Sequence, residues 1–98
     1  MNFIIKTTEI FLDQVRDLCE HDKQQINNKI SLLKQNPYRN KRLHSQKFSK
    51  AFRIRMNLSG KETRLIYVVL EPNIILVCLL ERKNDYKDLE KYLNKIWP

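Results

Sequence analysis

Apolar residues in the first third of the chain recur every three or four positions, which is the spacing of an amphipathic helix. A first predicted helix has an apolar face made of Phe11, Val15 and Leu18. A second has an apolar face made of Ile26, Ile30 and Leu33. This helix should end at Asn36, because the residue before a proline avoids the helical region. The two helices form a hairpin that follows a short apolar segment, residues 2–6, which predicts a strand.

Polar residues mark the expected starts of these helices. Thr7 or Thr8 can cap the first helix. After a break at residues 20–21, Asp22 with Gln25 three positions later resembles a capping box for the second. The hairpin is therefore expected to have a short connection.

In the middle of the chain, apolar residues recur at every second position instead of every third or fourth. In the segment AFRIRM, residues 51–56, apolar and cationic residues alternate, so Arg53 and Arg55 are expected on one face of a strand. The opposite, core-facing side of this strand consists of Phe52, Ile54 and Met56. Further strands are predicted at residues 63–70 and 74–80, separated by turns at 57–61 and 71–73.

A last helix is predicted after residue 85, with Asp85 as its cap. Its apolar stripe consists of Tyr86, Leu89, Leu93 and Ile96. The order of elements predicts an α+β fold, in which a small, mostly antiparallel sheet of about four strands is packed against an N-terminal helical hairpin and a C-terminal helix. The chain of 98 residues is expected to form a single domain over residues 1–98.

Several classes of protein are disfavoured by composition. The longest apolar run, residues 74–80, is far shorter than the ~20 residues of a membrane-spanning helix, and the N-terminus lacks the apolar core of a secretory signal. We therefore expect a cytoplasmic protein without a membrane partner. The two cysteines, Cys19 and Cys78, have no metal-ligand spacing and are expected to be inert core thiols.

The net charge of +8 is concentrated in one region. Residues 38–64 contain a single acid, Glu62, whereas the rest of the chain is neutral. The nine basic residues of this region are Arg39, Lys41, Arg42, Lys47, Lys50, Arg53, Arg55, Lys61 and Arg64. A local concentration of cations points to a polyanion or to an acidic protein as the partner, and a solvated surface is the alternative.

The residues favour phosphate chemistry over metal or nucleophile chemistry. His21 and His44 have no partners at metal-ligand spacing, and a chain with one glycine cannot form a Gly-rich phosphate loop, so no cofactor is expected. Guanidinium groups fixed on strands can bind a phosphate and stabilise charge that develops during phosphodiester cleavage. Tyr67 is out of phase with Arg64, which favours a core position, whereas Tyr86 can either contact RNA or belong to the helix stripe.

The order of motifs is distinctive over nearly the whole chain. It runs from a helical hairpin ending in NP through KRLHSQKF, AFRIRM and ETRLIYVV to a hydrophobic strand and a short basic segment with a tyrosine. This arrangement resembles the RelE/ParE superfamily of toxin-antitoxin toxins, and its most specific element is the pairing of FRIR with RLIY. The resemblance implies a cognate antitoxin protein as a partner. RelE-like members cleave mRNA on the ribosome, whereas ParE-like members share the fold and inhibit DNA gyrase.

The resemblance also implies site residues. Arg53 and Arg55 stand where RelE has two strand lysines, and Arg64 stands at the arginine of the RLxY motif. The implied catalytic set is Arg53, Arg55, Arg64, Arg82 and Tyr86. The expected RNA-binding set is Lys41, Arg42, His44, Lys47, Lys50, Lys61 and Lys83. Because arginine is a poor proton acceptor, the general base is open between His44 and Glu62, unless the enzyme works by orientation and charge stabilisation alone.

These observations leave three functions. The first is a ribosome-dependent, metal-independent mRNA endoribonuclease that inhibits translation. The second is a ParE-like gyrase inhibitor, and the third is a catalytically degenerate member that only binds. The basic sheet favours the ribonuclease, because neutralising RNA phosphates releases counterions.

Overall fold

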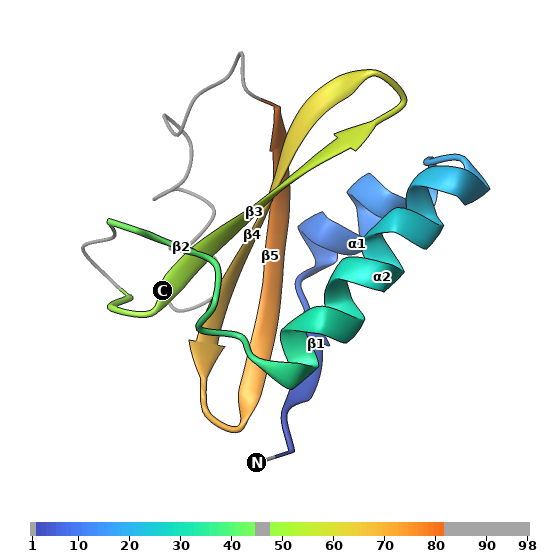
Figure 1. Ribbon diagram of the computed structural model, residues 1–98. Coiled ribbons are helices and arrows are strands. Elements are labelled where there is room, and N and C mark those ends of the chain that lie inside the picture. The colour runs from blue at the N-terminus through green and yellow to red at the C-terminus, as the bar shows by residue number, and fades with distance from the viewer. Residues whose placement is uncertain (1, 45–47, 82–98) are drawn as a thin grey trace.

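The computed structural model describes residues 2–44 and 48–81, which form an α+β fold with two helices and a five-stranded sheet (Figure 1). The helices are α1 (Glu9–Arg16) and α2 (Glu20–Gln35). The strands are β1 (Ile4–Thr7), β2 (Lys41–Leu43), β3 (Ala51–Leu58), β4 (Lys61–Leu70) and β5 (Asn73–Glu81). Within these ranges no helix is long and apolar enough to cross a membrane. The predicted C-terminal helix lies outside the described residues.

The sheet has the order β1-β5-β4-β3-β2, and only the β1–β5 pair is parallel. The expectation of about four strands was therefore one strand short. The additional strand is β2, whose three residues are too few and too polar to show an alternating pattern. The apolar β5 is paired on both sides, as its continuous run of hydrophobic residues predicted.

The helical hairpin covers one face of the sheet (Figure 1). From this side, Phe11, Ile26 and Leu33 pack into a core cluster with apolar residues of β3, β4 and β5. The strand residues of this cluster are Phe52, Ile54, Met56, Leu58, Leu65, Tyr67, Val69, Ile74, Leu76 and Leu79. The alternation predicted for AFRIRM is confirmed, since Phe52, Ile54 and Met56 belong to this core.

The opposite face of the sheet combines cations with a second apolar cluster. This cluster consists of Phe48, Ala51, Ile66, Val68, Val77, Cys78 and Leu80. Cys78 is fully buried there, and desolvation raises the pKa of its thiol to about 12. The thiol is therefore protonated and inert, as expected. The prediction for Cys19 was wrong, because this residue is exposed at the start of α2.

One predicted helix start is confirmed and the other is wrong. The Thr8 side chain caps α1 by accepting a hydrogen bond from the Phe11 amide at 3.0 Å. The second helix begins at Glu20 with Cys19 as its N-cap residue, so Asp22 lies inside the first turn. Asp22 is instead buried against the β3–β4 turn, where its carboxylate accepts hydrogen bonds from the Ser59 amide at 3.1 Å and from the Ser59 hydroxyl at 2.5 Å.

Tyr67 fixes the segment between α2 and β2. Its buried hydroxyl donates to the Pro37 carbonyl at 2.6 Å and accepts from the Asn40 amide at 3.1 Å. The Tyr67 ring also stacks on Phe52, with centroids 5.3 Å apart. Burial raises the pKa of Tyr67 to about 12, so its hydroxyl remains a donor at physiological pH. The core position expected for Tyr67 is thus confirmed, and through Asn40 it positions the start of β2.

The Asp22–Ser59 contact predicts a pH dependence of stability. The hydrogen bond from the Ser59 hydroxyl lowers the pKa of Asp22 below its ordinary value, although burial opposes this effect. The Asp22 carboxylate therefore stabilises the fold at any pH above its pKa in the unfolded chain, which is about 3.9. This contribution is lost as the pH falls through the lower pKa of Asp22 in the folded protein. Urea unfolding between pH 7 and pH 2 should show Asp22→Asn less stable than wild type at pH 7 and nearly equal at the acidic end.

The control for this prediction is Asp17→Asn, which changes an exposed carboxylate at the end of α1. It should leave the pH profile of stability close to that of wild type. A difference between wild type and Asp22→Asn that stays constant across the pH range would show that the carboxylate charge has no role in the contact.

Candidate functional site

The register of β3 and β4 gathers the predicted strand arginines on one face of the sheet. Arg55 lies directly opposite Arg64 in the antiparallel pair, and Arg53 lies two residues along β3 on the same face. On the other side of β3, Lys41 of β2 is the partner of Arg53. We call these four residues, from three adjacent strands, the cation cluster.

The members of the cation cluster differ in exposure. Arg53 and Arg64 are 9% and 7% exposed, whereas Arg55 is exposed to solvent. Burial on a strand leaves the Arg53 and Arg64 side chains little freedom to reorient, whereas the exposed Arg55 side chain is the one that a phosphate can reach directly. Glu62, the only acid in the basic region, is the partner of Asn57 and shares this face with Arg64 two residues away.

Four predicted RNA-binding residues lie apart from the cluster, namely Arg42, His44, Lys61 and Lys50. Arg42 is opposite Phe52 and places its guanidinium carbon 5.9 Å from the centre of that ring, on the helix-covered side of the sheet. His44 is exposed just after β2. Lys61 lies at the β3–β4 turn, where its Nζ is 3.7 Å from a carboxylate oxygen of Glu81.

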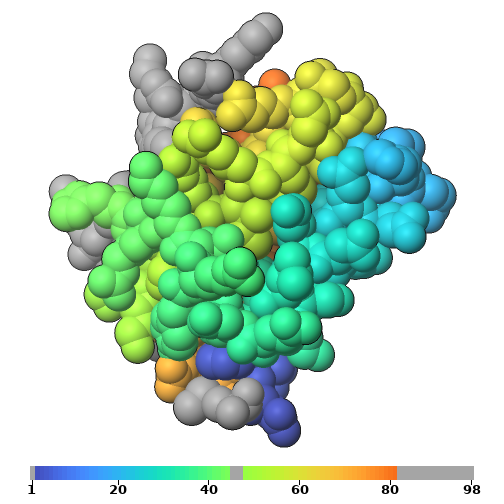
Figure 2. Space-filling view, in the orientation of Figure 1, coloured from blue at the N-terminus to red at the C-terminus, as the bar shows by residue number. Residues whose placement is uncertain are grey.

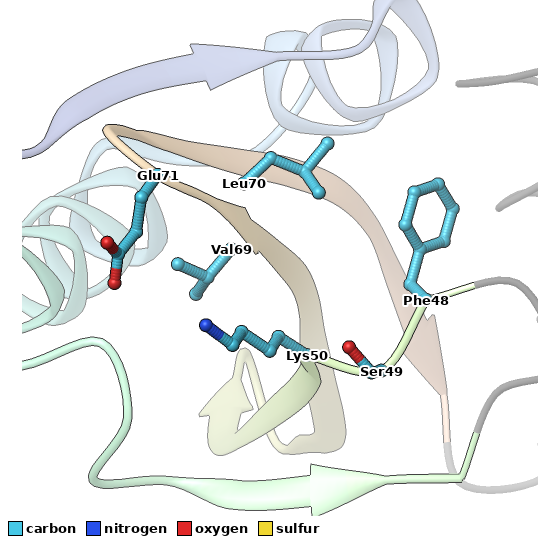
Figure 3. Close-up of a pocket in the computed structure, with 6 residues that line it drawn as sticks. All are labelled: Phe48, Ser49, Lys50, Val69, Leu70 and Glu71. Carbon is cyan, nitrogen blue, oxygen red and sulfur yellow. The ribbon is translucent and has the colours of Figure 1, made fainter.

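Lys50 lies apart from the cation cluster and lines a cavity of about 340 Å³ beside the β4–β5 turn. In Figure 3 its side chain extends across Val69 toward the same side as the Glu71 carboxylate. Lys50 Nζ is 5.4 Å from the centre of the Tyr38 ring, and the Tyr38 hydroxyl donates to Glu71, which raises the pKa of Tyr38. An acid in the lining makes this cavity less suited to a phosphate than the cation cluster.

The remaining predicted residues are not placed. Lys47, Arg82, Lys83 and Tyr86 lie outside the described residues. In the part of the chain that the structure describes, no three His, Cys, Asp or Glu side chains come together as a metal site.

One cation near the cluster was missed by the sequence analysis. Lys29 of α2 lines a cavity of about 490 Å³ together with Lys41, Arg53 and Arg55. A signal was present in the sequence, because Lys29 is three residues after Ile26 and four before Leu33, which places it beside the buried face of the helix. Asn40, held by the Tyr67 hydroxyl, lines the same cavity.

Solved structures of the E. coli toxin RelE are among the matches to the whole fold. A double arginine-to-alanine mutant of the E. coli toxin RelE in the free state aligns over all of both chains, with a TM-score of 0.75 and 16% identity. The isolated E. coli RelE toxin aligns over 98% of this chain and 99% of that one, with a TM-score of 0.65 and 17% identity. The chain therefore has a RelE-like fold.

A second state of the same toxin also matches. A chain of the intact E. coli RelBE toxin-antitoxin complex covers 81% of this chain and 94% of its own length, with a TM-score of 0.61 and 18% identity. No protein-family model and no curated protein matches the sequence. The likeness is thus one of fold at low sequence identity.

The Arg55–Arg64 pair predicts that the site weakens the fold. Like charges directly opposite each other on paired strands are destabilising, so Arg55→Gln should raise the free energy of unfolding by about 0.2–1 kcal/mol. The gain should shrink at high ionic strength, because salt screens the repulsion of the exposed partner. Urea unfolding at 50 mM and 500 mM NaCl measures both effects.

Lys6→Gln is the matched control for this prediction, because it removes one charge from an exposed position on β1, opposite the apolar Ile75 of β5. It should change the free energy of unfolding by less than Arg55→Gln does. Equal stability of wild type and Arg55→Gln at low salt would contradict the repulsion.

Proposed function

We propose that this chain, with its RelE-like fold, is the toxin of a type II toxin-antitoxin module and acts as a ribosome-dependent mRNA endoribonuclease. The observation that carries the proposal is the placement of Arg53, Arg55 and Arg64 together on one sheet face by the β3–β4 register. Three guanidinium groups in this arrangement match the negative charge of a phosphodiester as it passes through the transition state.

The proposed step is an attack of the RNA 2′-hydroxyl oxygen on the adjacent phosphorus. The bond to the 5′-oxygen of the next nucleotide breaks, which leaves a 2′,3′-cyclic phosphate and a 5′-hydroxyl. The arginines stabilise the extra negative charge on the phosphate oxygens, so the reaction needs no metal ion at this site. The 5′-oxygen takes up a proton from water as it leaves, and this proton balances the one lost from the 2′-hydroxyl.

The proton of the 2′-hydroxyl needs an acceptor, and arginine cannot serve. Glu62 is the candidate that the geometry favours, because it shares the sheet face with Arg55 and Arg64. His44 lies beyond the end of β2 and is exposed. We therefore assign the base role to Glu62, with the ribosome holding the mRNA in the geometry for attack.

The proposed partners follow from the charge of the site. The net charge of residues 38–64, with nine basic residues and one acid, favours the approach of mRNA and ribosomal RNA. A cognate antitoxin with an acidic segment would neutralise the same surface, in line with the complex that RelE forms in the E. coli RelBE structure. A gyrase inhibitor is the alternative, and the cleavage experiment below separates the two.

Substitution of Arg64 tests the proposed chemistry. Loss of one preorganised charge donor typically costs ~10²-fold or more in rate, so Arg64→Ala should reduce single-turnover cleavage of mRNA on programmed ribosomes by about that factor. Arg64→Lys keeps the charge but removes the planar fork, and should also cleave much more slowly than wild type. Primer extension on the mRNA measures both rates.

Lys61→Ala is the control, because Lys61 lies at the hairpin turn and is expected to affect binding more than the cleavage rate at saturation. Arg55→Ala, at an exposed position, provides a second test if Arg64→Ala does not fold. Wild-type cleavage by Arg64→Lys, Arg64→Ala and Arg55→Ala would overturn the proposed site. Intact mRNA on ribosomes together with blocked gyrase supercoiling would support the gyrase inhibitor instead.

A further inference from the structure

Two adjoining cavities form a groove where α2, residues 36–41 and β3 meet. They share Lys29, Asn40 and Ile54 in their lining and have volumes of about 320 Å³ and 490 Å³. Figure 2 views this side of the molecule, with α2 in teal and the 36–43 segment in green on either side of the yellow-green atoms of β3. We call this hollow the edge groove.

The edge groove is lined by cations from three parts of the chain. Its five basic residues are Lys29, Arg39, Lys41, Arg53 and Arg55. The described lining contains no acid, in contrast to the cavity around Lys50, which contains Glu71. The groove therefore attracts an anion more strongly than that cavity does.

The backbone of β3 adds a donor to the edge groove. The Val69 amide donates to the Lys50 carbonyl at 2.9 Å, and hydrogen bonding alternates along an antiparallel pair, so the backbone groups of Arg53 and Arg55 point away from β4. The pairing of β2 with β3 ends where Lys41 meets Arg53. The Arg55 amide therefore points toward the open edge of β3, between the side chains that line the groove.

The uncharged lining suits a nucleotide better than an isolated anion. Leu32 is 53% exposed and offers an apolar surface for a ribose or a base. Gln35 provides an exposed amide that can form hydrogen bonds with a base edge. Asn40 is held in place by its hydrogen bond to Tyr67, so this wall of the groove is fixed.

We propose that the edge groove binds the backbone of single-stranded RNA that continues from the cation cluster, so that the RNA turns over the open edge of β3 and runs toward Arg39. The proposal rests on the proposed function and deepens it. Arg53 and Arg55 belong to both sites, which makes the path continuous, and Lys29 contacts a phosphate outside the one that is cleaved. Lys29 is thus a binding residue and not a catalytic one.

The test measures binding of a non-cleavable 2′-O-methyl RNA dodecamer by fluorescence anisotropy over a range of NaCl concentrations. Each phosphate contact on a single strand contributes about 0.7 to the slope of log K against log salt. Lys29→Ala should make this negative slope shallower by about 0.7, and the double variant Lys29→Ala/Arg39→Ala should make it shallower by about 1.4. A trinucleotide that fills only the cation cluster should bind Lys29→Ala and wild type alike.

Lys34→Ala is the matched control, because it removes the same charge from the same helix outside the groove lining. It should leave the slope close to that of wild type. In single-turnover cleavage on ribosomes, Lys29→Ala should raise the toxin concentration needed for half-maximal rate and leave the rate at saturation unchanged.

Three results would overturn the inference, and they are distinguishable. The salt dependence of dodecamer binding could be the same for wild type, Lys29→Ala and Lys34→Ala while cleavage is intact. This result would show that RNA does not bind in the edge groove, and it would not affect the proposed function. Lys29-dependent binding of a polyglutamate peptide without any Lys29 effect on RNA would assign the groove to an acidic protein segment. Wild-type protein that neither binds the dodecamer nor cleaves mRNA would overturn the groove and the function together.

Discussion

The antiparallel pairing of Arg55 with Arg64 fixes which side chains share each face of the sheet. Because side chains alternate along a strand, a slip of one residue would move Phe52 to the cation side and the arginines into the helix-facing core. The stacked pair of Phe52 and Tyr67 on that core side, 5.3 Å between ring centres, opposes such a slip. Packing on the apolar, helix-covered face therefore stabilises a register that places Arg55 and Arg64 opposite each other on the other face.

Tyr67 also connects the core to the basic region. Tyr67 contributes its ring to the core and its hydroxyl to hydrogen bonds with Pro37 and Asn40. A single buried side chain therefore contributes to the packing of β3 on β4 and also fixes the path of the segment that enters β2. Lys41 follows directly and joins Arg53. The burial of a large aromatic side chain contributes about 1.5–3 kcal/mol, which exceeds the cost of a repulsive charge pair on a strand. The fold can thus retain charges that weaken it locally.

Much of this arrangement was predictable from local patterns. The alternation in AFRIRM placed Arg53 and Arg55 on one face, and the phase of Tyr67 relative to Arg64 placed the tyrosine in the core. Features that depend on contacts between distant segments were not predictable. β2 is a strand only because β3 pairs with it, and Asp22, which was expected to cap a helix, instead accepts hydrogen bonds from Ser59. The helical spacing placed Lys29 beside the buried face of α2, but only the packing of α2 brings it to the cavity that Arg53 lines.

The central claim is that the β3–β4 register makes Arg53, Arg55 and Arg64 one binding site for RNA phosphate. Solution NMR of arginine-labelled protein, titrated with a non-cleavable 2′-O-methyl RNA, follows the Nε–H signal of each side chain directly. We expect the three signals to shift together and to give one dissociation constant. Shifts confined to the exposed Arg55, with Arg53 and Arg64 unchanged at saturation, would contradict it.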